Sequence, residues 1–288
     1  MHKKTFFSLV LLISTVIASH LSSYAKMLTL EEGLYGIEPG TFQIDIADIY
    51  AGYDAWTFTG DTRQYKYGRA IQDMGIRYTL LSSMEISLGM QYMYWQQRVD
   101  GVDTAHKGGF GQAHWGIKFS LGPALAAGVE YFNAAVAPEK ELGGGADIKS
   151  YAVLESGSYY MNFAYIMTGE YTVKNPLTDE ATTYDPGEVI SGGMGFKIGK
   201  GNLMLICELR GTSFAENKVN GGEMADTAGL TLDVIGGLIL QLGKLKVKAG
   251  VGIGVGDENF RGPGISPARY HDVSYDISPV LGITYFLK

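Results

Sequence analysis

The sequence predicts an all-β protein: a transmembrane antiparallel up-and-down β-barrel of about 12 strands, with long extracellular loops and short periplasmic turns. Three observations predict this fold. Apolar and polar residues alternate through many segments, most of these segments reach about ten residues or more, and the connections between them alternate between long and short. Alternation puts successive side chains on opposite faces of a strand, and about 9–11 residues let a tilted strand cross a bilayer.

Two neighbouring segments show the pattern most clearly. In residues 84–94 the even-numbered positions are apolar, and the positions between them begin with Glu85, Ser87, Gly89 and Gln91. In residues 111–121 the parity is reversed, so that Trp115 and its odd-numbered neighbours form the apolar side. One apolar and one mostly polar face is what a barrel strand presents to lipid and to an aqueous interior.

The same alternation defines the other strands, of which residues 149–155 give the weakest pattern. The predicted strands in chain order are residues 41–51, 69–81, 84–97, 109–121, 124–135, 149–155, 159–173, 188–198, 203–213, 228–241, 244–255 and 273–287. An even number of strands brings both ends of the barrel to the periplasmic side.

The connections support a barrel over a soluble sandwich. Short turns rich in glycine, serine or proline fall at residues 82–83, 122–123, 156–158, 199–202 and 242–243. The predicted long loops are residues 53–68, 98–108, 136–148, 174–187, 214–227 and 256–272. A β-sandwich also alternates apolar and polar residues, but nothing in that fold sorts its loops by length. Outer-membrane barrels have long external loops and short periplasmic turns.

The N-terminus predicts export. Lys3 and Lys4 precede the apolar residues 6–17, and Ser23-Tyr24-Ala25 offers small residues for cleavage. We therefore expect residues 1–25 to be a cleaved secretory signal peptide. Residues 26–40 would be a periplasmic leader or an inward-folded plug, an alternative that the sequence leaves open, and residues 41–288 the barrel in the cell outer membrane.

The composition limits the kinds of partner and environment that we expect for the protein. The net charge is −7, which gives no electrostatic reason to bind nucleic acid. Cys207 is the single cysteine, so no intramolecular disulfide can form. The mean hydropathy of +0.03 fits strands with one face in lipid and the other in water. The expected partners are outer-membrane lipid, a small-molecule solute and the barrel assembly machinery.

Two groups of polar residues could in principle form a catalytic or a metal-binding site, but their spacing supports neither. His271, Asp272 and Ser274 form no oriented triad, because His271 and Ser274 have opposite strand parity. Asp100, Asp103 and His106 do not have the spacing of an EF-hand, and we expect them to lie in a solvent-exposed loop. We therefore expect no catalytic residues, no metal, no cofactor and no enzymatic activity.

The polar inward positions are the candidate functional residues. They carry both signs of charge, which suits a hydrated lumen where they would set selectivity. The alternative is that they pair across the interior and fill a narrow barrel, and alternation does not decide between the two. The pore-lining candidates are Glu85, Gln91, Gln112, His114, Lys118, Glu130, Asn162, Glu208, Arg210, Asp233, Lys246 and Lys248. Glu188 and Asp276 belong to the same predicted inward set.

Four segments resemble the meta-pathway phenol-degradation family of outer-membrane transporters: residues 38–42, 109–118, 160–165 and 207–211. Gln112 stands where that family usually has aspartate, and the chain ends in Lys288 where such barrels usually end in an aromatic residue. The resemblance implies a passive outer-membrane channel, a porin-like transporter for small aromatic or apolar molecules. A structural, adhesive or lipid-modifying barrel without an open pore is the alternative.

Overall fold

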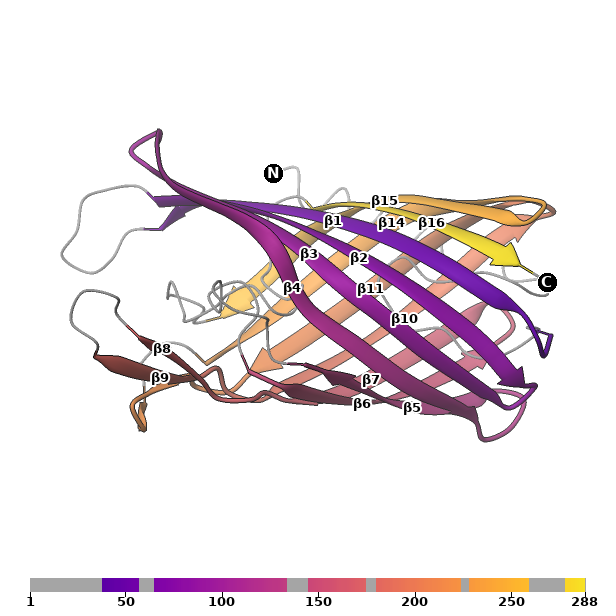
Figure 1. The fold of residues 1–288 in the computed structure, drawn as a ribbon. Helices are drawn as coiled ribbons and strands as arrows, with labels where there is room; N and C mark the ends of the chain where they lie inside the picture. Colours follow the sequence, from indigo (N-terminus) through magenta and orange to yellow (C-terminus); the bar gives the residue numbers. More distant parts are fainter. Residues whose placement is uncertain are drawn as a thin grey trace.

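Twelve antiparallel strands close into a barrel in the computed structural model, which describes residues 38–56, 65–133, 145–174, 180–223, 228–258 and 278–287 (Figure 1). The barrel order is β1-β16-β15-β14-β11-β10-β7-β6-β5-β4-β3-β2. The strands are β1 (Phe42–Trp56), β2 (Tyr65–Leu81), β3 (Met84–Val99), β4 (Val102–Ser120), β5 (Leu125–Phe132), β6 (Asp147–Ser156), β7 (Tyr159–Met167), β10 (Val189–Lys200), β11 (Leu203–Phe214), β14 (Gly229–Leu242), β15 (Leu245–Glu258) and β16 (Ser278–Leu287). The predicted fold class is confirmed.

The barrel closes where the first and last strands meet. β1 pairs with β16 from Phe42 opposite Leu287 to Ile49 opposite Val280, and on its other side β1 pairs with β2. Closure gives the backbone groups of both end strands a hydrogen-bonding neighbour. A sheet in hydrocarbon requires this, because no water is there to satisfy an open edge.

The outer face of the wall is apolar. Burial alternates along the strands, and the exposed alternate positions carry large apolar side chains such as Leu88, Trp115 and Phe163. The residues between them point inward and are largely buried. The outward parity predicted for residues 84–94 and 111–121 matches this pattern, apart from Gly111 at a bulge that lies opposite Gln91.

The long loop predicted at residues 98–108 is wrong. β3 and β4 instead continue as one ribbon to Val99 and Val102, joined by a two-residue turn. Asp100 and Gly101 take φ values of 50° and 81°, the positive angles of a tight hairpin turn for which Asp-Gly is a preferred sequence. Long and short connections therefore do not alternate strictly. The two strands, with 16 and 19 residues, exceed the crossing length.

A second sheet was not predicted. Residues 159–173, expected as one strand, divide into β7 and the short strand β8 (Tyr171–Lys174). β8 joins β9 (Ala181–Asp185), β12 (Lys218–Val219) and β13 (Gly222–Glu223) in a separate four-stranded sheet. β8 and β9 lie beyond the end of the barrel opposite the C-terminus (Figure 1). Two predicted long loops, residues 174–187 and 214–227, thus contain regular structure.

Some predictions fall on residues outside the described ranges. These are the signal peptide, most of the leader, and residues 273–277 of the last predicted strand together with His271, Asp272, Ser274 and Asp276. They stay predictions. Within the described ranges, no helix has the length and apolar character needed to span a membrane.

Candidate functional site: the barrel interior

The twelve pore-lining candidates all occupy inward positions of barrel strands. Nine are buried: Glu85, Gln91, Gln112, His114, Lys118, Glu208, Asp233, Lys246 and Lys248. Glu130, Asn162 and Arg210 are half-buried. Their role in lining a pore stays a prediction. Glu188 was predicted inward wrongly, because it is exposed, precedes β10 and has the parity of the outward Ile190.

An ionic network joins the inner faces of β1–β4 near their periplasmic ends, and β16 joins it where the Thr284 hydroxyl donates to Asp45 Oδ1 at 2.6 Å. The Arg77 guanidinium donates from Nε to Asp45 Oδ2 at 2.7 Å and from its terminal nitrogen to Asp45 Oδ1 at 3.0 Å. Glu85 accepts from Lys118 Nζ at 3.1 Å and from Gln43 Nε2 at 3.3 Å. Arg77 also lies 3.8 Å from Glu85, so the two carboxylates share one guanidinium. Shared pairing allows these charges to be buried together.

Further charge pairs continue around the wall. Lys149 Nζ donates to Glu130 at 3.0 Å, and Arg210 donates to Asp233 at 3.1 Å. Both pairs are register partners on adjacent strands, as Glu85 and Lys118 are. Each of these ion pairs, and those around Arg77 and Glu85, joins adjacent strands of the barrel. These pairs therefore lie along the wall and do not cross the barrel.

Inward rings lie close over glycines of the neighbouring strand, among them His114 over Gly89 and Tyr160 over Gly195. A Cβ atom added at Gly89 would come 2.3 Å from His114 Nε2, and one added at Gly195 would come 2.3 Å from the Tyr160 ring. The Tyr160 hydroxyl donates to Glu208 at 3.1 Å from this position. Glycine permits such close approach of a ring to the backbone. Each ring consequently lies against the inner surface of the sheet and extends less far into the interior than it would over a larger residue.

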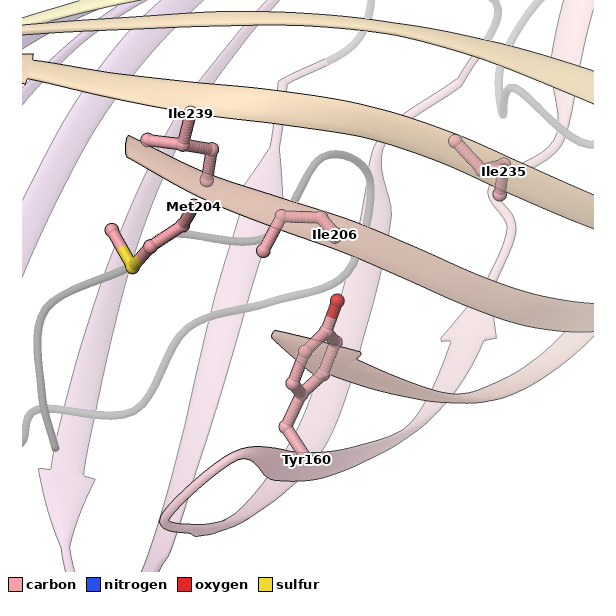
Figure 2. Packing of buried hydrophobic residues seen from close by; sticks show 5 residues of the cluster. All are labelled: Tyr160, Met204, Ile206, Ile235 and Ile239. Atoms are coloured by element: carbon pink, nitrogen blue, oxygen red, sulfur yellow. The ribbon is translucent and has the colours of Figure 1, made fainter. Parts of the chain in front are cut away.

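An apolar cluster occupies the inner face of β7, β11 and β14. Figure 2 shows Tyr160, Met204, Ile206, Ile235 and Ile239 gathered there, and all five side chains are buried. Sequence reasoning missed these residues, because an apolar residue at an inward position breaks the alternation. The signal was the uninterrupted apolar stretch 203–207, in which both faces are apolar.

The described residues give no support for a metal centre. No group of three or more His, Cys, Asp or Glu side chains in the described ranges could hold a metal ion. Asp100 and Asp103 are exposed at the tip of the β3–β4 ribbon. Cys207 is half-buried in β11 and is a free thiol.

Comparison with known proteins shows the fold. No family model and no curated protein matches the chain. Among solved structures, an outer membrane channel from Pseudomonas putida F1 superposes with a TM-score of 0.61 at 14% identity, covering 88% of this chain and 98% of that one. The beta domain of the Bordetella autotransporter Brka gives 0.52 at 10% identity, covering 86% and 100%. The chain thus has the fold of outer-membrane β-barrels, which these channels and autotransporter domains share.

Proposed function

We propose that the protein is an outer-membrane channel through which small molecules diffuse along the barrel interior. The observation that carries this proposal is the arrangement of the interior charges along the wall. Each of these four pairs joins neighbouring strands and does not bridge the lumen. A 12-stranded barrel lies between the eight strands that side chains fill and the 16–18 of open porins, so the path is narrow.

The apolar cluster supports a solute with an apolar or aromatic body. Tyr160 and the four aliphatic and thioether side chains beside it give one side of the interior a surface that water wets poorly. A solute with an apolar part would lose less hydration free energy there than over the ionic network. We propose that this uptake is passive. We assign the protein no enzymatic role.

Export and assembly complete the proposal. Residues 1–25 would direct the chain out of the cytoplasm, and the barrel assembly machinery would insert it into the outer membrane. Residues 26–40, as an arm or a plug, lead into β1 at the periplasmic end, where the Gly40 amide donates to the Thr79 carbonyl at 2.8 Å. A plug there would make the channel gated.

An adhesive barrel is the second candidate, and the second sheet favours it. β8, β9, β12 and β13 hold two connections together, with Tyr171 stacked on Tyr184 at 5.3 Å between ring centroids. An ordered sheet outside the barrel could present a surface to a partner. This candidate requires no passage through the lumen.

Conductance in a planar bilayer separates the two candidates. The full chain, purified in detergent and inserted into the bilayer, is expected to give discrete and stable current steps. A barrel that is folded, as shown by heat-modifiable mobility on a gel, and yet electrically silent would contradict the channel and favour the adhesive candidate.

A further inference from the structure

Three inward residues of β2, β3 and β4 form a cluster rich in hydrogen-bond acceptors. Asp73 and Gln91 are register partners on adjacent strands, which puts their side chains side by side on the inner face. Across β3, His114 Nε2 lies 3.0 Å from Asp73 Oδ1. The three side chains therefore meet at one place on the wall.

Two buried atoms of this cluster have no hydrogen-bond partner: Gln91 Oε1 and His114 Nδ1. Gln91 is 5% exposed and His114 is 9% exposed. Leaving a buried polar atom without a partner costs free energy, so native structures rarely leave two of them together without a bound ligand or water.

When the His114 ring is neutral, the missing partner of both atoms is a hydrogen-bond donor. A carboxylate only accepts hydrogen bonds, so the His114 Nε2–H donates to Asp73. In the neutral ring Nδ1 is then an acceptor, as Gln91 Oε1 is. The ring is held in this orientation by Gly89 beneath it and by Phe132, which stacks on it at 5.1 Å between centroids.

The cluster opens to the interior at Asp73. The Asp73 side chain is 36% exposed, more than the carboxylates of the other interior pairs described above. A species entering from the lumen would meet an accessible carboxylate first, with two unsatisfied acceptors behind it and an aromatic ring alongside.

We propose that Asp73, Gln91 and His114 form a binding subsite for the hydrogen-bond donors of a small solute, of which a primary ammonium on an apolar body is the best match. The carboxylate supplies the opposite charge, Gln91 and His114 accept the remaining N–H groups, and Phe132 contacts the apolar part. This inference rests on the proposed channel function and names a class of solute for it.

The test is calorimetric titration of the full chain in detergent micelles with two probes of equal charge. Benzylammonium has N–H donors, and benzyltrimethylammonium has none. We expect benzylammonium to bind about fivefold more tightly, the gain of one net hydrogen bond. Equal affinities, expected if ordered water alone fills the subsite, would overturn the proposal.

Substitutions test whether the difference in affinity between the two probes arises at this subsite. Gln91→Leu combined with His114→Phe should reduce the difference between the probes, because only Asp73 then accepts from benzylammonium. Gln91→Glu, which adds a carboxylate, should strengthen benzylammonium binding. Thr212→Val removes another buried hydroxyl without a partner, on β11, and should leave the difference unchanged. An undiminished difference in the double variant, with its fold verified by heat-modifiable mobility, would place binding elsewhere and overturn the assignment.

The experiments can contradict the channel proposal and the subsite proposal independently of each other. A silent barrel that still prefers benzylammonium would retain the subsite and contradict the channel. A conducting barrel with equal affinities for the two probes would retain the channel and contradict the subsite.

Discussion

The inner wall of the barrel has two unlike arcs. On β16 and β1–β4 it carries the ionic network around Arg77 and Glu85, whereas on β7, β11 and β14 it carries the apolar cluster around Tyr160 and Ile239. The outer faces of both arcs are alike, with large exposed apolar side chains. Lipid sets the outer face everywhere, so differences of function between regions of the wall are confined to the inner face.

The two arcs should respond differently to substitution. Removing one member of a buried ionic network leaves the other charges without compensation. Trimming an apolar cluster costs only the transfer free energy and the cavity left behind. The charged arc should therefore be the more sensitive, and the following substitutions compare the two in order of expected effect.

Glu85→Leu should have the largest effect. Glu85 is 2% exposed and accepts from Lys118 and Gln43 beside Arg77, so its loss leaves two buried cations short of a partner. We expect the free energy of unfolding to fall by about 3–5 kcal/mol, measured by urea unfolding in micelles. Glu85→Gln, which retains an acceptor, should cost less. A loss below about 1 kcal/mol for Glu85→Leu would show that the network contributes little.

Ile239→Ala tests the apolar arc. Ile239 is fully buried in the inner cluster, and removing its side chain should lower the free energy of unfolding by about 2–4 kcal/mol. Ile283→Ala on the outward face of β16 is the matched control, since lipid can fill the space it leaves. Equal losses at the two positions would mean that the inner cluster is no better packed than the lipid-facing surface.

Gly195→Ala tests the ring lying flat over the wall. The added Cβ would meet the Tyr160 ring at 2.3 Å, which should cost about 1–3 kcal/mol and push the ring into the path, lowering the conductance. Gly236→Ala is the control, because its Cβ would meet nothing within 4 Å. Unchanged current steps in Gly195→Ala would place Tyr160 outside the path of ions.

Thr183→Val should have the smallest effect. The Thr183 hydroxyl lies 3.0 Å from that of Thr172 in the second sheet, outside the barrel. We expect a loss of less than about 1 kcal/mol and unchanged conductance, with faster protease cleavage between β8 and β9 as the readout. A lowered conductance would instead connect this sheet to the path through the lumen.

The sequence predicted the outward face well and the inner face only in part. Lipid demands an apolar residue at every second position, so strand parity at Leu88 or Trp115 follows from alternation alone. Inward residues meet no such uniform requirement, and Ile206 and Ile235 therefore looked like breaks in the pattern. Which charges pair, as Glu85 does with Lys118, depends on register between strands, and alternation carries no information on register.

The turn and the second sheet were missed for different reasons. Asp100-Gly101 is a hairpin sequence that could have been recognised, because its positive φ angles are those the turn requires. β8 and β9, with 4 and 5 residues, are too short for a period-two pattern to stand out. The pairing of β9 with β12 joins segments more than 30 residues apart, which local sequence does not predict.

The reversal potential across a planar bilayer with a salt gradient tests the central claim most directly. Lys246 and Lys248 are inward residues of β15, and Lys246 Nζ lies 5.1 Å from the centre of the Phe286 ring. If these side chains face the path of ions, Lys246→Glu combined with Lys248→Glu should shift the reversal potential towards cation selectivity. An unchanged reversal potential in a folded, conducting variant would contradict the account.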